Sequence, residues 1–252
     1  TAWAQRITKT GASARTLPGR LEEAGALGVL TSQWSGGYGV TRIFNAYTRR
    51  VPTFDLSCED YGLVARLAQN NQHPQVEAFA ESESLGDQPT FNVVAEMPGT
   101  VLPNEYVLLS AHLDSWDAGS GATDNATGTV IMLEAMRILK QVYPNPRRTI
   151  LVGHWDSEEQ GLNGSRGFAA DHPTIVQGLQ AAFNQDNGTG RLASLSPAGL
   201  TMASGNLARW LAQVPAALTR SINFGVPGSP SGGGSDNASF ICSGAPAFGL
   251  GS

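Results

Sequence analysis

The residues of this chain best suited to chemistry are a histidine and several carboxylates that follow predicted strands. In α/β sheets, functional groups gather just beyond the carboxyl ends of the strands. Many carboxylates in one small space repel one another, so such a cluster calls for divalent cations. One histidine among carboxylates is a ligand set typical of a catalytic zinc site. The candidates are His112, Asp114, Asp124, Glu158, Glu159 and Asp186.

The spacing of these residues indicates a different chemical role for each. Alternate side chains of an extended backbone lie on the same face, so Asp114 is placed to hold the imidazole of His112 in one tautomer. Glu158 and Glu159 are adjacent in the sequence. One of the two can therefore bind a metal ion while the other serves as a general base toward water.

The elements that must position these residues form an α/β series. Strands that alternate with helices predict a mostly parallel mixed sheet sandwiched by helices. In the helix at 126–140, Met132, Leu133, Met136 and Leu139 lie on one side. The predicted strands are Phe91–Met97, Tyr106–Ala111, Thr149–Val152, Leu179–Phe183 and Ala247–Leu250, and the predicted helices cover 126–140 and 205–213.

Residues 1–85 predict a smaller α/β domain, separated by a turn-rich linker from a larger domain at 86–252. No cluster of chemistry-bearing residues occurs in the smaller part. Ser57, followed three residues later by Asp60, resembles a capping box that begins a helix. Strands are expected there at Gly25–Leu30 and Val51–Leu56.

Composition excludes several classes of protein. The chain has 252 residues and a net charge of −5, with no basic block, which argues against a nucleic-acid partner. No apolar run reaches the ~18 residues that a membrane span requires. Cys58 and Cys242 lack the spacing of a zinc knuckle or a redox pair. Two buried thiols are the favoured interpretation, with a disulfide as the alternative.

Four ordered motifs resemble the co-catalytic di-zinc exopeptidases, the family of zinc aminopeptidases and plasma glutamate carboxypeptidase. The resemblance covers 86–252 and implies the zinc exopeptidase fold for that part. Residues 1–85 resemble part of a protease-associated (PA) domain. The matching stretches are His112–Asp117, Gly121–Gly128, Trp155–Gly161 and Asn184–Gly188.

The resemblance implies two Zn²⁺ ions and a role for each matching residue. His112, Asp124 and Asp186 would hold the first ion, and Asp124 would bridge it to the second. Glu159 would bind the second ion and Glu158 would be the general base. Members of the family hydrolyse peptides or dipeptides, usually with a free N-terminus, so we expect such substrates here. The resemblance also implies a secreted or periplasmic location, and a homodimer is one possible assembly.

One departure from the family pattern concerns the second ion. The family takes a further histidine from a loop after the last strand, whereas no histidine follows His172 in this chain. We therefore expect the sequence to be a fragment at both ends, with the second metal site incomplete as written. Asp236 and Asn237 follow a glycine-rich run and are candidates either to cap a helix or to line the substrate cleft.

Two alternatives stay open at this point. Without the last histidine, the chain could be a non-catalytic, peptidase-like binding module that uses its PA part to contact a partner. A single-metal hydrolase that uses only His112, Asp124 and Asp186 is the other alternative.

Overall fold

The computed structural model describes residues 6–34, 43–83, 85–116, 119–228 and 234–252. Its contacts divide the chain into two compact units, Thr1–Asp87 and Gln88–Ser252. Asp117, which belongs to one of the predicted motifs, lies outside the described residues, as does most of the glycine-rich run before Asp236. Within the part that the structure describes, no helix is long and apolar enough to cross a membrane.

The N-terminal unit is a small α/β arrangement around two parallel strands. Ser57 begins helix α3 as predicted, because its hydroxyl accepts the backbone N–H of Asp60 at 3.1 Å. The predicted strand at Gly25–Leu30 is wrong in its first half. Gly25, at φ +91°, ends helix α2, and Leu27 is 93% exposed. The elements are η1 Thr8–Thr10, α2 Leu17–Glu23, β1 Val29–Thr31, β2 Thr53–Asp55 and α3 Cys58–Gln69.

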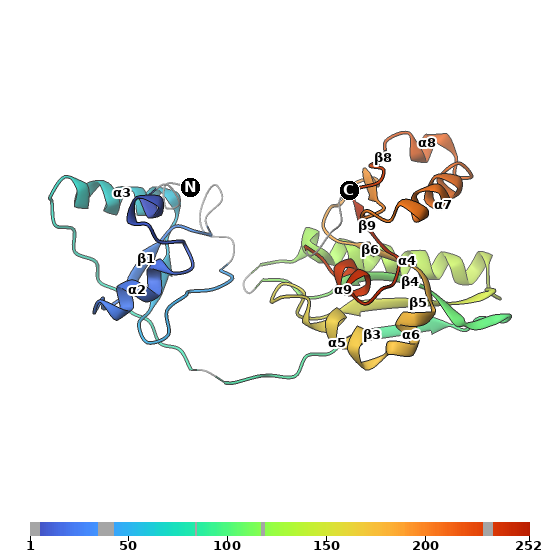
Figure 1. Ribbon diagram of the computed structural model, residues 1–252, viewed down its shortest axis with the longest axis horizontal. Coiled ribbons are helices and arrows are strands. Elements are labelled where there is room, and N and C mark those ends of the chain that lie inside the picture. Colours follow the sequence, from blue (N-terminus) through green and yellow to red (C-terminus); the bar gives the residue numbers. More distant parts are fainter. Residues whose placement is uncertain (1–5, 35–42, 84, 117–118, 229–233) are drawn as a thin grey trace. The chain divides into compact units, whose positions relative to one another are not determined.

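The second unit contains a seven-stranded mixed sheet with the order β3-β5-β4-β6-β9-β7-β8 (Figure 1). The four central strands, β5, β4, β6 and β9, run parallel to one another. Strand β3 pairs antiparallel with β5, and β7 pairs antiparallel with β9. The strands are β3 Val93–Met97, β4 Leu102–His112, β5 Arg148–Trp155, β6 Leu179–Gln185, β7 Ser194–Ser196, β8 Asn223–Phe224 and β9 Ala247–Gly251.

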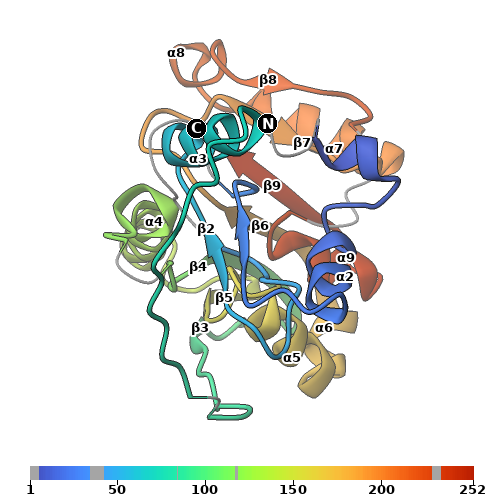
Figure 2. The same ribbon diagram turned by 90° about the vertical axis from the view of Figure 1, so that its left-hand side faces the viewer.

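Helices cover both faces of this sheet, with α4 on one side and α5, α6 and α9 on the other (Figure 2). The second of these faces carries the larger core, in which Trp155 packs against Phe168 and Phe240 at ring-centroid distances of 5.0 and 5.6 Å. The helical elements are η2 Ala122–Ala126, α4 Thr127–Val142, α5 Asn163–Asp171, α6 Pro173–Gly178, α7 Thr201–Leu211, α8 Ala216–Thr219 and α9 Asn237–Cys242.

The apolar side predicted for the helix at 126–140 is buried unevenly in α4. Leu133 is 50% exposed, whereas Met132 is 2% exposed. Successive helical residues are rotated by about 100°, so one step along the chain takes Leu133 off the face that meets the sheet. Cys58 and Cys242 are both exposed instead of buried, and neither is in a disulfide within the described residues. Cys58 stands in the first turn of α3 and Cys242 in the last turn of α9.

Candidate metal centre

The site lies at the carboxyl ends of three parallel strands. Strand β4 ends at His112, which pairs with Trp155 at the end of β5. Strand β6 ends at Gln185, one residue before Asp186. Because these strands are parallel neighbours, the residues that follow them meet at one edge of the sheet. Tertiary structure thus gathers groups that are far apart in sequence.

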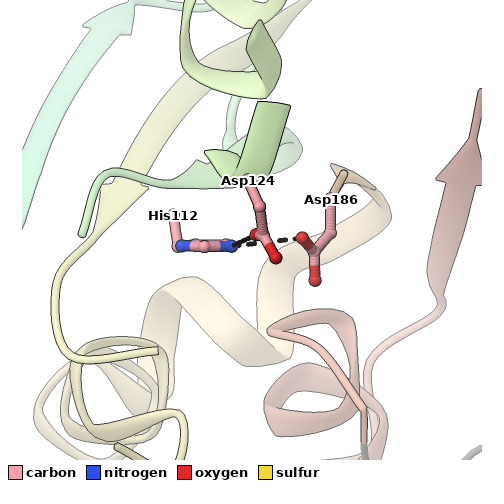
Figure 3. Close-up of side chains that lie close together, drawn as sticks. All are labelled: His112, Asp124 and Asp186. Carbon is pink, nitrogen blue, oxygen red and sulfur yellow. Dashed lines mark hydrogen bonds and ion pairs between the residues drawn. The ribbon is translucent and has the colours of Figure 1, made fainter. Parts of the chain in front are cut away.

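Three of the predicted ligands converge on one point, as Figure 3 shows. The Nε2 atom of His112 lies 3.1 Å from an oxygen of Asp124 and 3.1 Å from an oxygen of Asp186. The three ligand atoms lie within 4.8 Å of one another. Two atoms bound to one tetrahedral zinc ion at about 2.0–2.1 Å lie roughly 3.3 Å apart. The observed spacing therefore fits a single zinc ion.

The other ring nitrogen of His112 fixes how the imidazole is used. Nδ1 lies 3.1 Å from the backbone oxygen of Asp114 and 3.4 Å from its carboxylate. An Nδ1–H that donates to Asp114 leaves the lone pair of Nε2 facing Asp124 and Asp186. That lone pair and two carboxylates repel one another unless a cation lies between them. The donor set therefore fits a metal ion.

The carboxylates around His112 shift the pKa of its imidazole. Burial opposes protonation of His112, but hydrogen bonds to Asp114 and Asp186 outweigh burial and raise its pKa to about 11. For Asp114, burial would raise the pKa, yet the hydrogen bonds that it accepts from His112 and Glu158 lower it.

Asp114 also connects His112 to the loop that carries the two glutamates. Its two carboxylate oxygens accept the backbone N–H groups of Glu158 and Glu159 at 3.0 and 3.1 Å. A single carboxylate therefore orients the imidazole and positions the loop after β5.

Glu158 and Glu159 stand in different surroundings. Glu158 has an oxygen 3.9 Å from Nε2 of His112, and burial raises its pKa to about 8. Glu159 lies outside the three-ligand cluster. Its carboxylate accepts the indole N–H of Trp116 at 2.5 Å. Burial, and then the charge of Asp124, raise the pKa of Glu159.

The segment that presents Asp124 is held by a residue that the sequence analysis did not single out. The side chain of Asn125 is 1% exposed, donates to the backbone oxygen of Gln185 at 2.9 Å and accepts the backbone N–H groups of Gly128 and Asn187, each at 3.2 Å. A Cβ atom at Gly128 would lie 2.7 Å from that same oxygen of Gln185. Only glycine therefore lets α4 begin this close to β6.

A second group that the sequence analysis missed reaches Asp186 through Ser235, whose hydrogen bond helps to lower the pKa of the Asp186 carboxyl. The hydroxyl of Ser110 donates to the side chain of Asn184 at 2.8 Å, and Asn184 donates to the hydroxyl of Ser235 at 2.8 Å. Ser110 and Asn184 are almost completely buried. Polar residues at alternate positions near the ends of two apolar strands were the available signal in the sequence.

Asp236 and Asn237 are both buried, Asp236 completely. Asp236 begins α9 but makes no side-chain capping bond, and neither of its oxygens has a hydrogen-bond partner among the described residues. The nearby hydroxyl of Ser165 is instead 2.8 Å from the hydroxyl of Ser239. Burial raises the pKa of Asp236 to about 7. A role for these two residues in substrate binding stays a prediction.

Asp156, a further carboxylate in the stretch Trp155–Gly161, has a structural role. It accepts the hydroxyl of Thr90 and, at 2.9 Å, the backbone N–H of Ser157. These bonds tie the loop after β5 to the residues that precede β3.

A mixed sheet with a histidine and two carboxylates at its parallel strand ends defines a metal-binding α/β protein. The sequence profile described as Peptidase family M28 matches residues 92–251, and the chain belongs to that family. The resemblance found in the motifs is therefore confirmed at the level of the family.

Curated relatives agree with this assignment. Carboxypeptidase Q of Bos taurus is 32% identical over 175 residues, which are 69% of this chain and 36% of the relative. Carboxypeptidase Q of Mus musculus is 30% identical over 201 residues, which are 80% of this chain and 42% of the relative. The chain spans well under half the length of these two relatives.

Solved structures show the same fold. A Peptidase M28 precursor from Shewanella amazonensis has a TM-score of 0.70 at 23% identity, and the match covers 96% of this chain and 54% of that one. A zinc aminopeptidase from Bacillus subtilis has a TM-score of 0.61 at 22% identity, covering 91% and 54%. The predicted fold class, a mostly parallel mixed sheet between helices, is confirmed. The PA assignment of residues 1–85 stays a prediction.

Proposed function

We propose that this chain carries the metal-binding core of a zinc-dependent exopeptidase. One observation carries the proposal: Nε2 of His112 faces Asp124 and Asp186 at 3.1 Å, while Asp114 holds Nδ1. Membership of a peptidase family and relatives named carboxypeptidase Q support hydrolysis of a peptide bond.

His112, Asp124 and Asp186 would hold one zinc ion, and Asp124 together with Glu159 would hold a second. Zinc bound at these residues supplies Lewis-acid activation of a water molecule and of the scissile carbonyl. Asp114 orients His112 for this purpose, and such outer partners fix the tautomer and raise the basicity of a ligating imidazole.

Glu158 is the proposed general base. Its carboxylate lies 3.9 Å from Nε2 of His112, so it reaches a water molecule placed over the cluster. It accepts a proton from the attacking water and returns that proton to the leaving amine. The hydrogen bond from its backbone N–H to Asp114 keeps it in place.

We further propose, from family membership, that the substrates are peptides or dipeptides with a free N-terminus. A secreted or periplasmic location and a homodimer are part of the same proposal.

The test compares two glutamate variants of the zinc-loaded protein on a panel of dipeptides and aminoacyl p-nitroanilides. Glu158→Gln should lower kcat by about 10²–10⁴-fold, the usual contribution of a general base, with no change in bound zinc. The matched control is Glu134→Gln on α4, an exposed residue paired with Arg137, and it should keep full activity. Retained turnover in Glu158→Gln contradicts the assigned role.

Elemental analysis of the same samples decides between the alternatives. Two zinc ions per chain with turnover support the co-catalytic mechanism. One ion with turnover favours a hydrolase that uses only His112, Asp124 and Asp186. Bound zinc without turnover of any substrate favours a non-catalytic binding module.

A further inference from the structure

We propose that Trp116 is a positioning residue of the metal site, whose indole N–H holds one oxygen of Glu159 and leaves the other oxygen for the metal ion. The inference rests on the proposed function, because it takes Glu159 to be a zinc ligand. The role of Trp116 is not part of that proposal, and it can fail separately.

The geometry of the contact supports this role. Nε1 of Trp116 donates to Oε2 of Glu159 at 2.5 Å, and Glu159 is only 7% exposed. Among the described residues, no other side chain donates a hydrogen bond to this carboxylate. A buried carboxylate is costly unless it is hydrogen-bonded. Because a carboxylate has two oxygens, the bond to Oε2 leaves Oε1 available as a ligand.

The chemistry of the donor suits a site for a cation. Negative charge surrounds Glu159, since the carboxylates of Asp124 and Asp114 both interact with it electrostatically. A lysine or an arginine would also keep the carboxylate ionised, but its positive charge would repel the metal ion. The indole N–H is a neutral group that only donates. It therefore orients Glu159 without competing with the ion.

The segment that follows β4 carries three of the residues that organise the site. His112 ends the strand, and Asp114 and Trp116 follow it at intervals of two in the irregular segment beyond. The first contributes a ligand, the second holds the backbone N–H groups of Glu158 and Glu159, and the third holds the side chain of Glu159. One short segment thus organises both parts of the site.

The first experiment uses the unaltered chain. It has five tryptophans, so ¹⁵N-labelled indole groups give few NMR signals, which triple-resonance experiments assign. We expect the Trp116 N–H to be protected from solvent exchange without metal, to stay protected with zinc, and to shift more on zinc addition than the signals of Trp34 and Trp210. A Trp116 N–H signal that does not shift when zinc is added, or that loses its protection from solvent exchange when zinc binds, overturns the inference.

The second experiment removes the donor and keeps an aromatic ring. Trp116→Phe should weaken binding of the zinc ion at Glu159 by about 10–100-fold, the usual effect of losing an outer-shell partner. Zinc at the three-ligand cluster should keep its affinity within about twofold. The matched control is Trp210→Phe, on α7 and 47% exposed, which should bind zinc as the unaltered chain does.

The outcomes separate this inference from the proposed function. Unchanged zinc affinities in Trp116→Phe overturn the role of Trp116, even if the unaltered chain hydrolyses peptides. Zinc-dependent changes at Trp116 in a chain that hydrolyses nothing support the role of Trp116 and contradict the proposed activity.

Discussion

The two sides of the metal site are built in different ways. On the His112 side, three ligand atoms from β4, η2 and the end of β6 converge within 4.8 Å. On the other side, Glu159 is a single buried carboxylate held by Trp116. The first side is organised by the sheet, because parallel strands bring their ends together. The second depends on one loop, in which Asp114 binds the backbone N–H of Glu159 and Trp116 binds its carboxylate.

This difference indicates which side of the site is held more rigidly. The elements around His112 are fixed by strand pairing and by the buried side chains of Asn125 and Asn184. Among the described residues, Glu159 is hydrogen-bonded to Asp114 and to Trp116. We therefore expect the ion on the His112 side to bind more tightly than an ion at Glu159, and two predictions test this contrast.

The largest effect should come from removing one negative charge on each side. Asp186→Asn should abolish tight zinc binding on the His112 side, because it removes one of three converging ligands. Glu159→Gln should lose only the ion on its own side and should leave the His112 side loaded. Zinc per chain after dialysis and the zinc Kd are the measurements.

Glu134→Gln on the exposed face of α4 is the control for both variants. A Glu159→Gln protein that loses all of its zinc would show that the two sides are not separable.

An intermediate effect is expected from Asp114→Asn, because Asp114 serves both sides. It holds Nδ1 of His112 and accepts the backbone N–H groups of Glu158 and Glu159. Loss of such a partner costs about 10–100-fold in metal affinity. Calorimetric titration with zinc should show weaker binding on both sides, with Asp171→Asn on α5 as control. Weakening on one side alone would contradict a shared role.

The last prediction concerns the free energy of unfolding instead of zinc affinity, and it depends on Asp236, which interacts electrostatically with His112 and Asp186. Burial raises the pKa of Asp236 from 3.8 to about 7, so the folded state keeps a proton that the unfolded state has released. The free energy of unfolding should therefore fall as the pH rises from about 4 to about 7, by up to roughly 4 kcal/mol.

In Asp236→Asn the side chain at this position carries no charge at any pH. The variant should therefore lack this part of the fall in the free energy of unfolding. Urea unfolding with a chelator at pH 5 and pH 8 measures it. The free energy of unfolding of Asp236→Asn minus that of the unaltered chain should be larger at pH 8 than at pH 5. Equal differences at both pH values would show that the carboxylate titrates normally.

Much of the larger unit could be predicted from the sequence, but the strand ends could not. The apolar run that predicts a strand to Ala111 continues as β4 through His112, and the strand predicted to end at Val152 continues as β5 to Trp155. Both added parts contain a buried histidine, His112 in β4 and His154 in β5. Hydrophobic periodicity carries no signal for such residues.

The sequence by itself determined the class of the protein and its candidate ligands. One histidine among carboxylates after successive strands predicts a metal site, since few other arrangements tolerate so much negative charge. The motif order also identified the family. Helix α3 began where its capping residue predicts, because capping depends on neighbours within one turn.

Only the tertiary structure decided which of these carboxylates act together. Sequence spacing cannot show that Asp124 and Asp186 meet His112 while Glu159 turns to Trp116, because those contacts join segments that are distant in the chain. Nor does it reveal that Asn125 and Asn184 are buried supports. Their hydrogen bonds exist only once the strands have paired, and strand pairing is a property of the whole sheet.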